Sequence, residues 1–280
     1  MENSKNQEEK NVRSVCIFGL SGDPPTGNGG HMGIVSSISS MTKKFEEREV
    51  FCFHEVRVIP VFRHMFASKR NKLSTFDNRL EMCKLTFHDI PRVVVSSLER
   101  EIFEDLTEGK SDQEKMGVRI GTADVFDALK KKEPETKFTL ALGLDTFMNL
   151  TDGKWRRWKD VISHVDGRIL VIQRDFSLVV DASASTQLKT VHSRTDAEVS
   201  ERIEILNEEW CPHHQRESTD KIEAHPVNFI RVPSLTSISS TAIRLTKDIS
   251  FLNSSLKPSV VEYIVAKQLY AFSEDDESNL

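Results

Sequence analysis

The best candidates for phosphate chemistry in this chain lie in residues 19–31, which read GLSGDPPTGNGGH. An apolar run precedes them and a segment of helical periodicity follows, so we expect them to link a strand to a helix. Glycines allow the backbone to approach a ligand closely, and the N–H groups at a helix N-terminus attract anions. His31 would then stand at the start of the helix as a donor to the bound group. The loop alone is equally compatible with a tight turn, since it fits neither the G-x-G-x-x-G nor the P-loop pattern.

A second candidate phosphate-binding segment, ISSTAIR at residues 238–244, follows the last predicted strand. Its consecutive hydroxyls could cap a helix or donate to phosphate oxygens, and the guanidinium of Arg244 suits the same oxygens. An N-cap followed by a surface arginine is the simpler interpretation of this segment by itself. Strands of one parallel sheet end at the same edge, so the two segments are expected to meet there and to hold a polyphosphate together.

The elements that would position these groups are predicted by alternating patterns. The six apolar runs that are predicted to be strands are residues 15–18, 56–61, 93–96, 138–142, 168–172 and 229–232. Segments with helical spacing lie between them. This order predicts an α/β fold: a Rossmann-like, doubly wound parallel sheet of about six strands with helices on both faces.

Three helices have specific signals. Apolar residues from Ile34 to Phe45 share one helical face, and Ser74 with Asp77 resembles a capping box before a helix that carries Leu80, Cys83 and Phe87. Pro258 suits the first turn of a C-terminal helix.

We predict a single domain over residues 13–272, between a polar tail at 1–12 and an acidic tail at 273–280. Residues 105–117 are expected to be a charged loop. Residues of about 177–227 are expected to be a polar insertion, within which Val199, Ile203, Leu206 and Trp210 have the spacing of an amphipathic helix.

Composition narrows the class of protein. The chain has 280 residues, 38% of them hydrophobic and 29% charged, and a net charge of −5, which argues against a general nucleic-acid binder. No apolar run approaches membrane-spanning length. The four cysteines are scattered, which favours free thiols in the cytoplasm or the nucleus. Cys211, His213 and His214 lie close together, but without a second ligand pair we expect a surface loop and no protein metal site.

At residues 19–31 and 238–244 the chain resembles the nicotinate/nicotinamide mononucleotide adenylyltransferases of the nucleotidylyltransferase superfamily. That superfamily carries an (H/T)-x-G-H signature after strand one, commonly preceded by Asp-Pro, and a late I-S-S-T-x-x-R signature. Here Asp23-Pro24 and Gly30-His31 match the first signature, and residues 238–244 match the second completely. Further similar segments occur in the family's order over most of residues 14–272: IPV at 59–61, FDNRLEM at 76–82, LGLDTF at 142–147, KWRRW at 154–158 and LKPSVVEYI at 256–264.

Two departures from the family pattern concern the binding loops. The first loop is about two residues longer than usual, and Thr26 takes the place of the first histidine, as threonine does in the pantetheine-phosphate adenylyltransferases. Gly121 stands where the family often has an aromatic residue before Thr122.

The resemblance implies transfer of AMP from ATP to nicotinate or nicotinamide mononucleotide, with pyrophosphate leaving and Mg²⁺ held mainly by the ATP phosphates. It implies that His31, Arg244 and Lys69 serve the reaction. The residues expected to bind ATP and its phosphates are Gly19, Leu20, Ser21, Thr26, Gly30, His31, Ser239, Ser240, Thr241 and Arg244.

The mononucleotide is expected at Thr122, Gly143, Asp145 and Trp155, whose indole would stack on the pyridine ring. Asp145 is equally well explained as a helix cap, and Trp158 as a core residue. The alternatives to this function are a transferase of the same fold acting on another phosphorylated acceptor, such as pantetheine phosphate, and a catalytically weak nucleotide-binding protein. The oligomeric state, a homo-oligomer included, and the preference between the two mononucleotides are left open.

Overall fold

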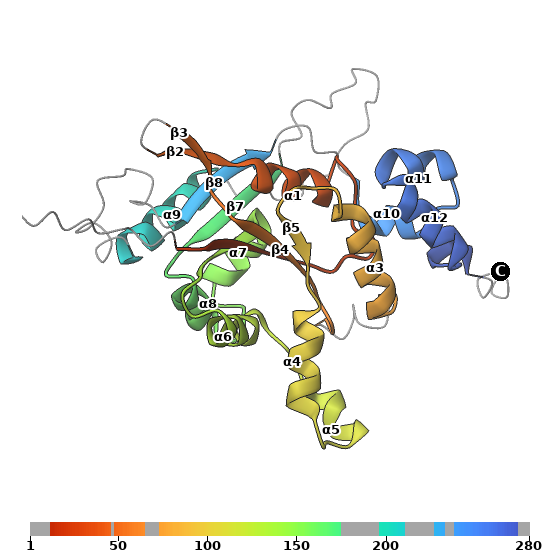
Figure 1. Ribbon diagram of the computed structural model, residues 1–280, viewed down its shortest axis with the longest axis horizontal. Helices are drawn as coiled ribbons and strands as arrows, with labels where there is room; N and C mark the ends of the chain where they lie inside the picture. The colour runs from red at the N-terminus through yellow and green to blue at the C-terminus, as the bar shows by residue number, and fades with distance from the viewer. Residues whose placement is uncertain are drawn as a thin grey trace, which may run out of the picture.

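The computed structural model describes residues 12–45, 48–64, 73–174, 196–210, 227–232 and 238–273. A sheet of six parallel strands lies at its centre, in the order β5-β4-β1-β6-β7-β8 (Figure 1). The strands are β1 (Ser14–Leu20), β4 (Glu55–Pro60), β5 (Val93–Val95), β6 (Lys137–Gly143), β7 (Ile169–Arg174) and β8 (Val227–Val232). This is the order of a doubly wound sheet, with β1 at the point where the winding reverses. All six predicted strands are confirmed.

Helices cover both faces of the sheet because successive side chains of each strand point to opposite sides. Cys16 and Phe18 of β1 pack with helices α1 (His31–Ser40) and α3 (Phe76–Phe87). Val15 and Ile17 belong to the core of the other face. The helices on that face are α4 (Leu98–Thr107), α6 (Thr122–Lys132), α7 (Leu144–Thr151), α8 (Trp158–His164) and α9 (Asp196–Trp210). The predicted two-sided arrangement is therefore confirmed.

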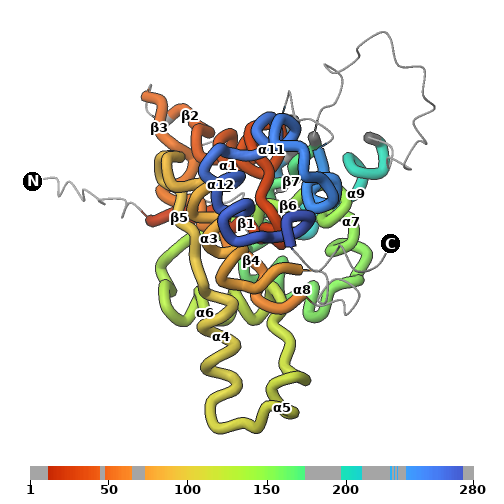
Figure 2. Tube along the Cα trace, turned by 90° about the vertical axis from the view of Figure 1, so that its right-hand side faces the viewer, coloured from red at the N-terminus to blue at the C-terminus, as the bar shows by residue number. Residues whose placement is uncertain are grey.

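The C-terminal part forms a third apolar cluster beside α3. It consists of α10 (Ser240–Arg244), α11 (Ile249–Ser255), α12 (Pro258–Ala266) and the short 3-10 helix η2 (Tyr270–Phe272). Pro258 opens α12 as predicted, and Val260, Val261 and Ile264 pack with Met82 of α3. These helices lie at one end of the molecule in Figure 1 and face the viewer in Figure 2.

The helix predicted to extend to Phe45 is wrong beyond Ser40. Residues after it form an antiparallel hairpin of β2 (Thr42–Phe45) and β3 (Arg48–Phe51). Met41 takes an extended conformation (φ −59°, ψ 130°) and ends the helix. Met41 and Phe45 are four residues apart, a spacing that fits one face of a helix or one face of a strand. The pairing of β2 with β3 decides between the two.

The charged loop predicted at residues 105–117 is also wrong. Residues up to Thr107 complete α4, and α5 (Asp112–Gly117) follows with a capping box of Ser111 and Glu114. Helix α5 buries no residue, so it has no apolar stripe that a sequence pattern could reveal. In Figure 1 it extends with α4 away from the sheet.

Of two further helix predictions, one is wrong in its capping residue and the other is confirmed. Thr75, rather than Ser74, caps α3, and its side chain accepts from the N–H of Asn78. Within the predicted insertion, α9 is the expected amphipathic helix, with Val199 and Leu206 in the core. Most of residues 177–227, and the tails at 1–11 and 274–280, lie outside the described residues.

Candidate active site

The two predicted phosphate-binding segments meet at the carboxyl edge of the sheet. The first leaves β1 at Leu20, runs through residues 21–30 and enters α1 at His31. We call residues 21–31 the phosphate loop. The second segment lies at the start of α10, where Ser239 is the N-cap and its side chain accepts from the N–H of Ala242.

Thr26 and His31 bond to each other inside the phosphate loop. The main-chain N–H of Thr26 donates to Nδ1 of His31 (3.1 Å), and the main-chain N–H of His31 donates to Oγ1 of Thr26 (2.9 Å). Oγ1 of Thr26 also lies 2.8 Å from Nδ1. Because Nδ1 accepts a main-chain N–H, the neutral imidazole carries its proton on Nε2. The ring is thereby oriented to donate from Nε2, at the helix N-terminus that favours an anion.

Two glycines of the loop are required by close approach. A Cβ on Gly30 would lie 1.9 Å from Oγ1 of Thr26, so a side chain there would displace the threonine that holds His31. Gly22 has a φ of +65°, and a Cβ on it would lie 2.7 Å from Sγ of Cys83. The glycines therefore serve the packing of the loop itself. By contrast, Gly19 is exposed and a Cβ would meet no atom within 4 Å, which leaves its backbone open to a ligand.

Direct hydrogen bonds join the second segment to the first. Ser240 Oγ donates to the carbonyl of Pro24 (2.9 Å), and Nη1 of Arg244 donates to the carbonyl of Asp23 (2.6 Å). Nη2 of Arg244 donates to Oγ1 of Thr241 (3.1 Å). Hydroxyls, main-chain N–H groups and a guanidinium thus gather at one place, which is the donor set that phosphate oxygens accept.

Leu20 and Ser21, at the start of this segment, are bonded to neighbouring elements through their main-chain carbonyls. Leu20 is part of the core, and its carbonyl accepts from the N–H of Val61 (2.9 Å). The carbonyl of Ser21 accepts from Nη1 of Arg79 (2.8 Å). Lys69, the third expected catalytic group, lies outside the described residues.

The sequence reasoning assigned no role to Arg79, which is fully buried behind the loop. Besides Ser21, its guanidinium donates to the carbonyls of Ser74, Val61 and Phe62. Burial lowers the pKa of Arg79, and the negative charge of Asp23 opposes this effect. Arg79 follows Phe76 and precedes Cys83 on the buried face of α3. A charged residue on an apolar helical face was the signal that could have identified it.

Three of the four residues expected to bind the mononucleotide stand at helix starts. Thr122 opens α6, while Gly143 ends β6 and is the N-cap of α7. Asp145 is exposed in the first turn of α7, and Gly143 occupies the N-cap position, so the alternative interpretation of Asp145 as the helix cap is wrong. Trp155 and Trp158 are both half-buried and pack against the core on the face of the sheet that carries α6 and α8.

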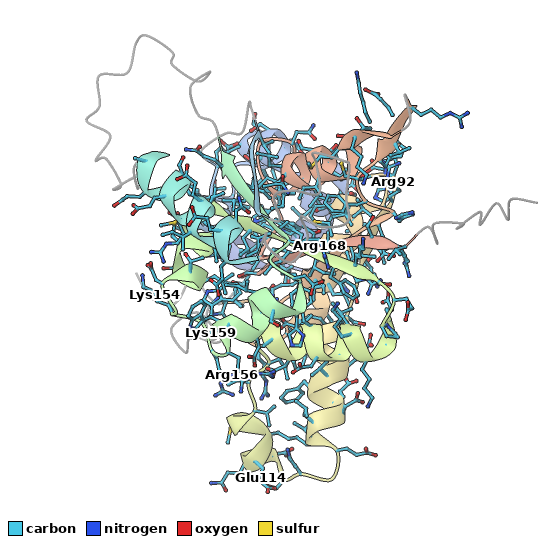
Figure 3. All side chains as sticks on the ribbon, turned by 90° about the vertical axis from the view of Figure 1, so that its left-hand side faces the viewer. Arg92, Glu114, Lys154, Arg156, Lys159 and Arg168 are labelled. Atoms are coloured by element: carbon cyan, nitrogen blue, oxygen red, sulfur yellow. The ribbon has the colours of Figure 1, made fainter. Side chains whose placement is uncertain are left out.

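Asp124 connects the two elements that carry Thr122 and Trp155. Its Oδ2 accepts from the N–H of Gly121 (2.7 Å) and from Nη2 of Arg156. Arg156 is visible in Figure 3, which views the molecule from the side opposite α11 and α12. Asp124 also accepts from Arg157 at 3.3 Å. The start of α6 and the segment before α8 are therefore held together by one carboxylate.

A cavity of about 570 Å³ lies beside the phosphate loop. Ser74, Arg79, Arg63 and Arg119 contribute polar groups to its wall, and Phe62 and Phe76 contribute aromatic rings. Behind it, the buried carboxylate of Glu99 accepts from the N–H of Phe62 (2.7 Å). Burial raises the pKa of Glu99 to about 7.

Within the ranges that the structure describes, no three His, Cys, Asp or Glu side chains stand close enough together to hold a metal ion, and no helix has the length and apolar character needed to span a membrane. Cys211, His213 and His214 lie outside those ranges.

No family model matches the chain. Among curated proteins, the probable nicotinate-nucleotide adenylyltransferases of Anaeromyxobacter dehalogenans strain 2CP-1 and Anaeromyxobacter sp. strain K are 33% and 32% identical to it over 120 residues. The match covers 43% of this chain and 54% of each relative, so the chain spans about half the length of the curated relatives it matches.

Among solved structures, the Plasmodium falciparum nicotinic acid mononucleotide adenylyltransferase is similar in both its complex with APC (TM-score 0.57) and its complex with NaAD (TM-score 0.58). Each comparison covers 93% of this chain and 98% of the other at 19% identity, so it concerns the fold. The resemblance predicted from the sequence motifs is therefore confirmed: the chain is related in sequence to nicotinate-nucleotide adenylyltransferases over 120 residues, and it has the fold of a nicotinic acid mononucleotide adenylyltransferase.

Proposed function

We propose that the protein is an adenylyltransferase that transfers AMP from ATP to nicotinate or nicotinamide mononucleotide. The observation that carries this proposal is the direct bonding of Ser240 and Arg244 to the phosphate loop, next to His31. It brings the hydroxyls and the guanidinium of the second segment against the phosphate loop, at the carboxyl edge of the sheet. The sequence relationship to nicotinate-nucleotide adenylyltransferases supports the choice of acceptor.

The reaction needs positioning more than covalent chemistry from the protein. An oxygen of the mononucleotide phosphate attacks the α-phosphorus of ATP, the bond between the α-phosphorus and the bridging oxygen breaks, and pyrophosphate leaves with the electron pair. His31 would donate from Nε2 to the α-phosphate, where negative charge shifts in the transition state. Thr26 holds the imidazole in the required tautomer and orientation.

The remaining donors would hold the leaving group. Ser239, Ser240, Thr241 and Arg244 would bind the β- and γ-phosphates, and Lys69 would add a cation. Gly30 and the loop backbone would approach the phosphates, while Gly19 leaves space for the nucleotide. On the acceptor side, Thr122, Gly143, Asp145 and Trp155 would bind the ribose and the pyridine ring.

Mg²⁺ would reach the site on the ATP phosphates. Hydroxyls, N–H groups and Arg244 fit phosphate oxygens rather than a cation, and Mg²⁺ keeps phosphate and water ligands readily. When bound there, the ion would neutralise charge on the phosphate chain. No protein residue is needed to hold it directly.

The test is an assay of the purified protein with ATP and Mg²⁺, with nicotinate mononucleotide, nicotinamide mononucleotide and pantetheine phosphate in separate reactions. We expect pyrophosphate and the adenine dinucleotide to form together from a pyridine mononucleotide. Product from pantetheine phosphate alone would identify a different acceptor. ATP binding without product from any acceptor would indicate a nucleotide-binding protein and contradict the proposal.

A further inference from the structure

We propose that Tyr270 is a positioning residue for the phosphate loop and acts on it through the carboxylate of Asp23. The inference rests on the adenylyltransferase function proposed above, and it assigns a role in ATP binding to η2, at the far end of the chain. Neither signature segment contains Tyr270.

Three distant parts of the chain converge on Asp23, which is 2% exposed. The Tyr270 hydroxyl donates to its Oδ1 at 2.7 Å, and the Ser74 hydroxyl donates to the same oxygen at 2.6 Å. Nη1 of Arg244 lies 3.8 Å from Oδ2, which has no hydrogen-bond partner among the described residues. Tyr270 therefore supplies one of the two side-chain hydrogen bonds that hold a buried carboxylate. Leaving such a group underbonded is costly.

The surroundings of the Tyr270 hydroxyl keep it protonated, so it serves as a donor to Asp23. Burial, and then the negative charge of Asp23, raise the pKa of Tyr270, so the phenol stays protonated at neutral pH. The buried guanidinium of Arg79 provides the nearby positive charge that a buried carboxylate needs.

The backbone reaches this position through an unusual turn. After α12 ends at Ala266, both Gln268 (φ +50°) and Tyr270 (φ +58°) take the left-handed conformation that residues with a side chain rarely adopt. The turn places the Tyr270 hydroxyl over α3, where it also lies 3.7 Å from Sδ of Met82. Strained backbone of this kind persists when the surrounding contacts require it, and the contact with Asp23 is such a requirement.

Asp23 transmits the contact to the groups that would bind ATP. Its carbonyl accepts from Arg244, and the next carbonyl, of Pro24, accepts from Ser240. Further along the loop, the N–H of Gly27 donates to the carbonyl of Ser255 (2.8 Å). The C-terminal segment therefore holds both ends of the stretch that contains Thr26. A loop that loses one of these attachments would bind the triphosphate less well.

The test is Tyr270→Phe, which removes one oxygen and keeps the ring. We expect the KM for ATP to rise by about tenfold, as loss of a hydrogen bond to a charged group would produce, while the KM for the mononucleotide stays within about twofold. Tyr263→Phe is the matched control, since the Tyr263 hydroxyl donates to Asn78 of α3 (2.9 Å) and makes no contact with the phosphate loop. It should leave both constants unchanged.

A double-mutant cycle with Ser74→Ala tests the route through Asp23. Both hydroxyls donate to one oxygen, so the effects of Tyr270→Phe and Ser74→Ala on ATP binding should be non-additive. Additive effects, or a Tyr270→Phe protein with a lower melting temperature but an unchanged KM for ATP, would overturn the inference.

Calorimetric titration with ATP and Mg²⁺ separates this inference from the proposed function. If the wild-type protein makes no dinucleotide, the proposed function fails, and the affinity for ATP still tests Tyr270. An affinity reduced by about tenfold in Tyr270→Phe supports the inference. An equal affinity in the two proteins contradicts it.

Discussion

Thr26 and His31 hold each other: the main-chain N–H of each donates to a side-chain atom of the other, at 3.1 Å and 2.9 Å. A histidine at the N-terminus of a helix is thereby fixed with its proton on Nε2. Thr26 itself is 3% exposed. The pair explains how a loop with threonine in place of the family's first histidine can still present the second histidine.

Replacing His31 by alanine tests its role in the transition state. We expect kcat to fall by about 10²–10³, the effect of losing one oriented donor, while the affinity for ATP changes by only a few-fold. Steady-state kinetics and ATP titration measure the two quantities. His88→Ala is the control, because that histidine lies at the exposed C-terminus of α3. Equal losses in kcat and in affinity would make His31 a ground-state binder only.

Gly30→Ala should damage the loop although it removes no side chain. The new Cβ would lie 1.9 Å from Oγ1 of Thr26, so the threonine must move and release the imidazole. We expect a loss of about 1–3 kcal/mol in the free energy of unfolding, together with a large loss of dinucleotide formation. Urea unfolding and the activity assay measure these effects. Gly117→Ala, where a Cβ meets no atom within 4 Å, should do neither.

Glu99 should make stability depend on pH. Burial raises its pKa in the folded protein from 4.5 to about 7, so folding takes up a proton between these values and stability falls as the pH rises through this window. Glu99→Gln should remove this dependence. Relative to wild type, its free energy of unfolding should increase by about 2–3 kcal/mol between about pH 5 and pH 8.

The neighbouring Glu101 offers a control of opposite sign. Its hydrogen bond with Lys132 lowers its pKa, so its contribution is present above the unfolded-state pKa and is lost as the pH falls. Urea unfolding of Glu101→Gln across the same range should show no gain relative to wild type at high pH. A gain equal to that of Glu99→Gln would exclude burial of Glu99 as the cause.

Asp124→Ala should weaken binding of the mononucleotide but not of ATP. The substitution removes the acceptor for Gly121 at the start of α6 and for Arg156, so Thr122 and Trp155 lose their common support. We expect a higher KM for the mononucleotide, an unchanged KM for ATP, and a loss of about 1 kcal/mol in stability from the missing cap. Asp127→Ala is the matched control, since it also removes a partner of Arg157 but leaves Gly121 bonded. The idea fails if both variants raise the same KM equally.

Much of the fold and of the site could be predicted because the signals are local. The six strands were recognisable as short apolar runs, and their alternation with helices implies parallel pairing. The segments at 19–31 and 238–244 follow strands directly, and a parallel sheet brings such segments to one edge. The hydrogen bonds from Ser240 to Pro24 and from Arg244 to Asp23 join the two segments there.

The elements that the sequence concealed are those whose conformation depends on distant partners. Residues 42–45 and 48–51 pair as a hairpin although Met41 and Phe45 have helical spacing, and α5 forms without burying any side chain. Ser74 was expected to cap a helix, but its hydroxyl instead donates to Asp23 and the neighbouring Thr75 caps α3. A short polar side chain can either cap a helix or bond to a distant group, and the sequence does not distinguish these two outcomes.

The residue types and their order along the chain thus determined the parallel sheet, the two donor segments and His31 at a helix start, since each depends on neighbours a few positions away. Only the tertiary structure decided that Asp23 is held by Ser74 and Tyr270 and that Arg79 is buried behind the loop. These contacts join residues up to 247 positions apart. A buried charge finds its partners through the packing of whole elements, and no local pattern records that packing.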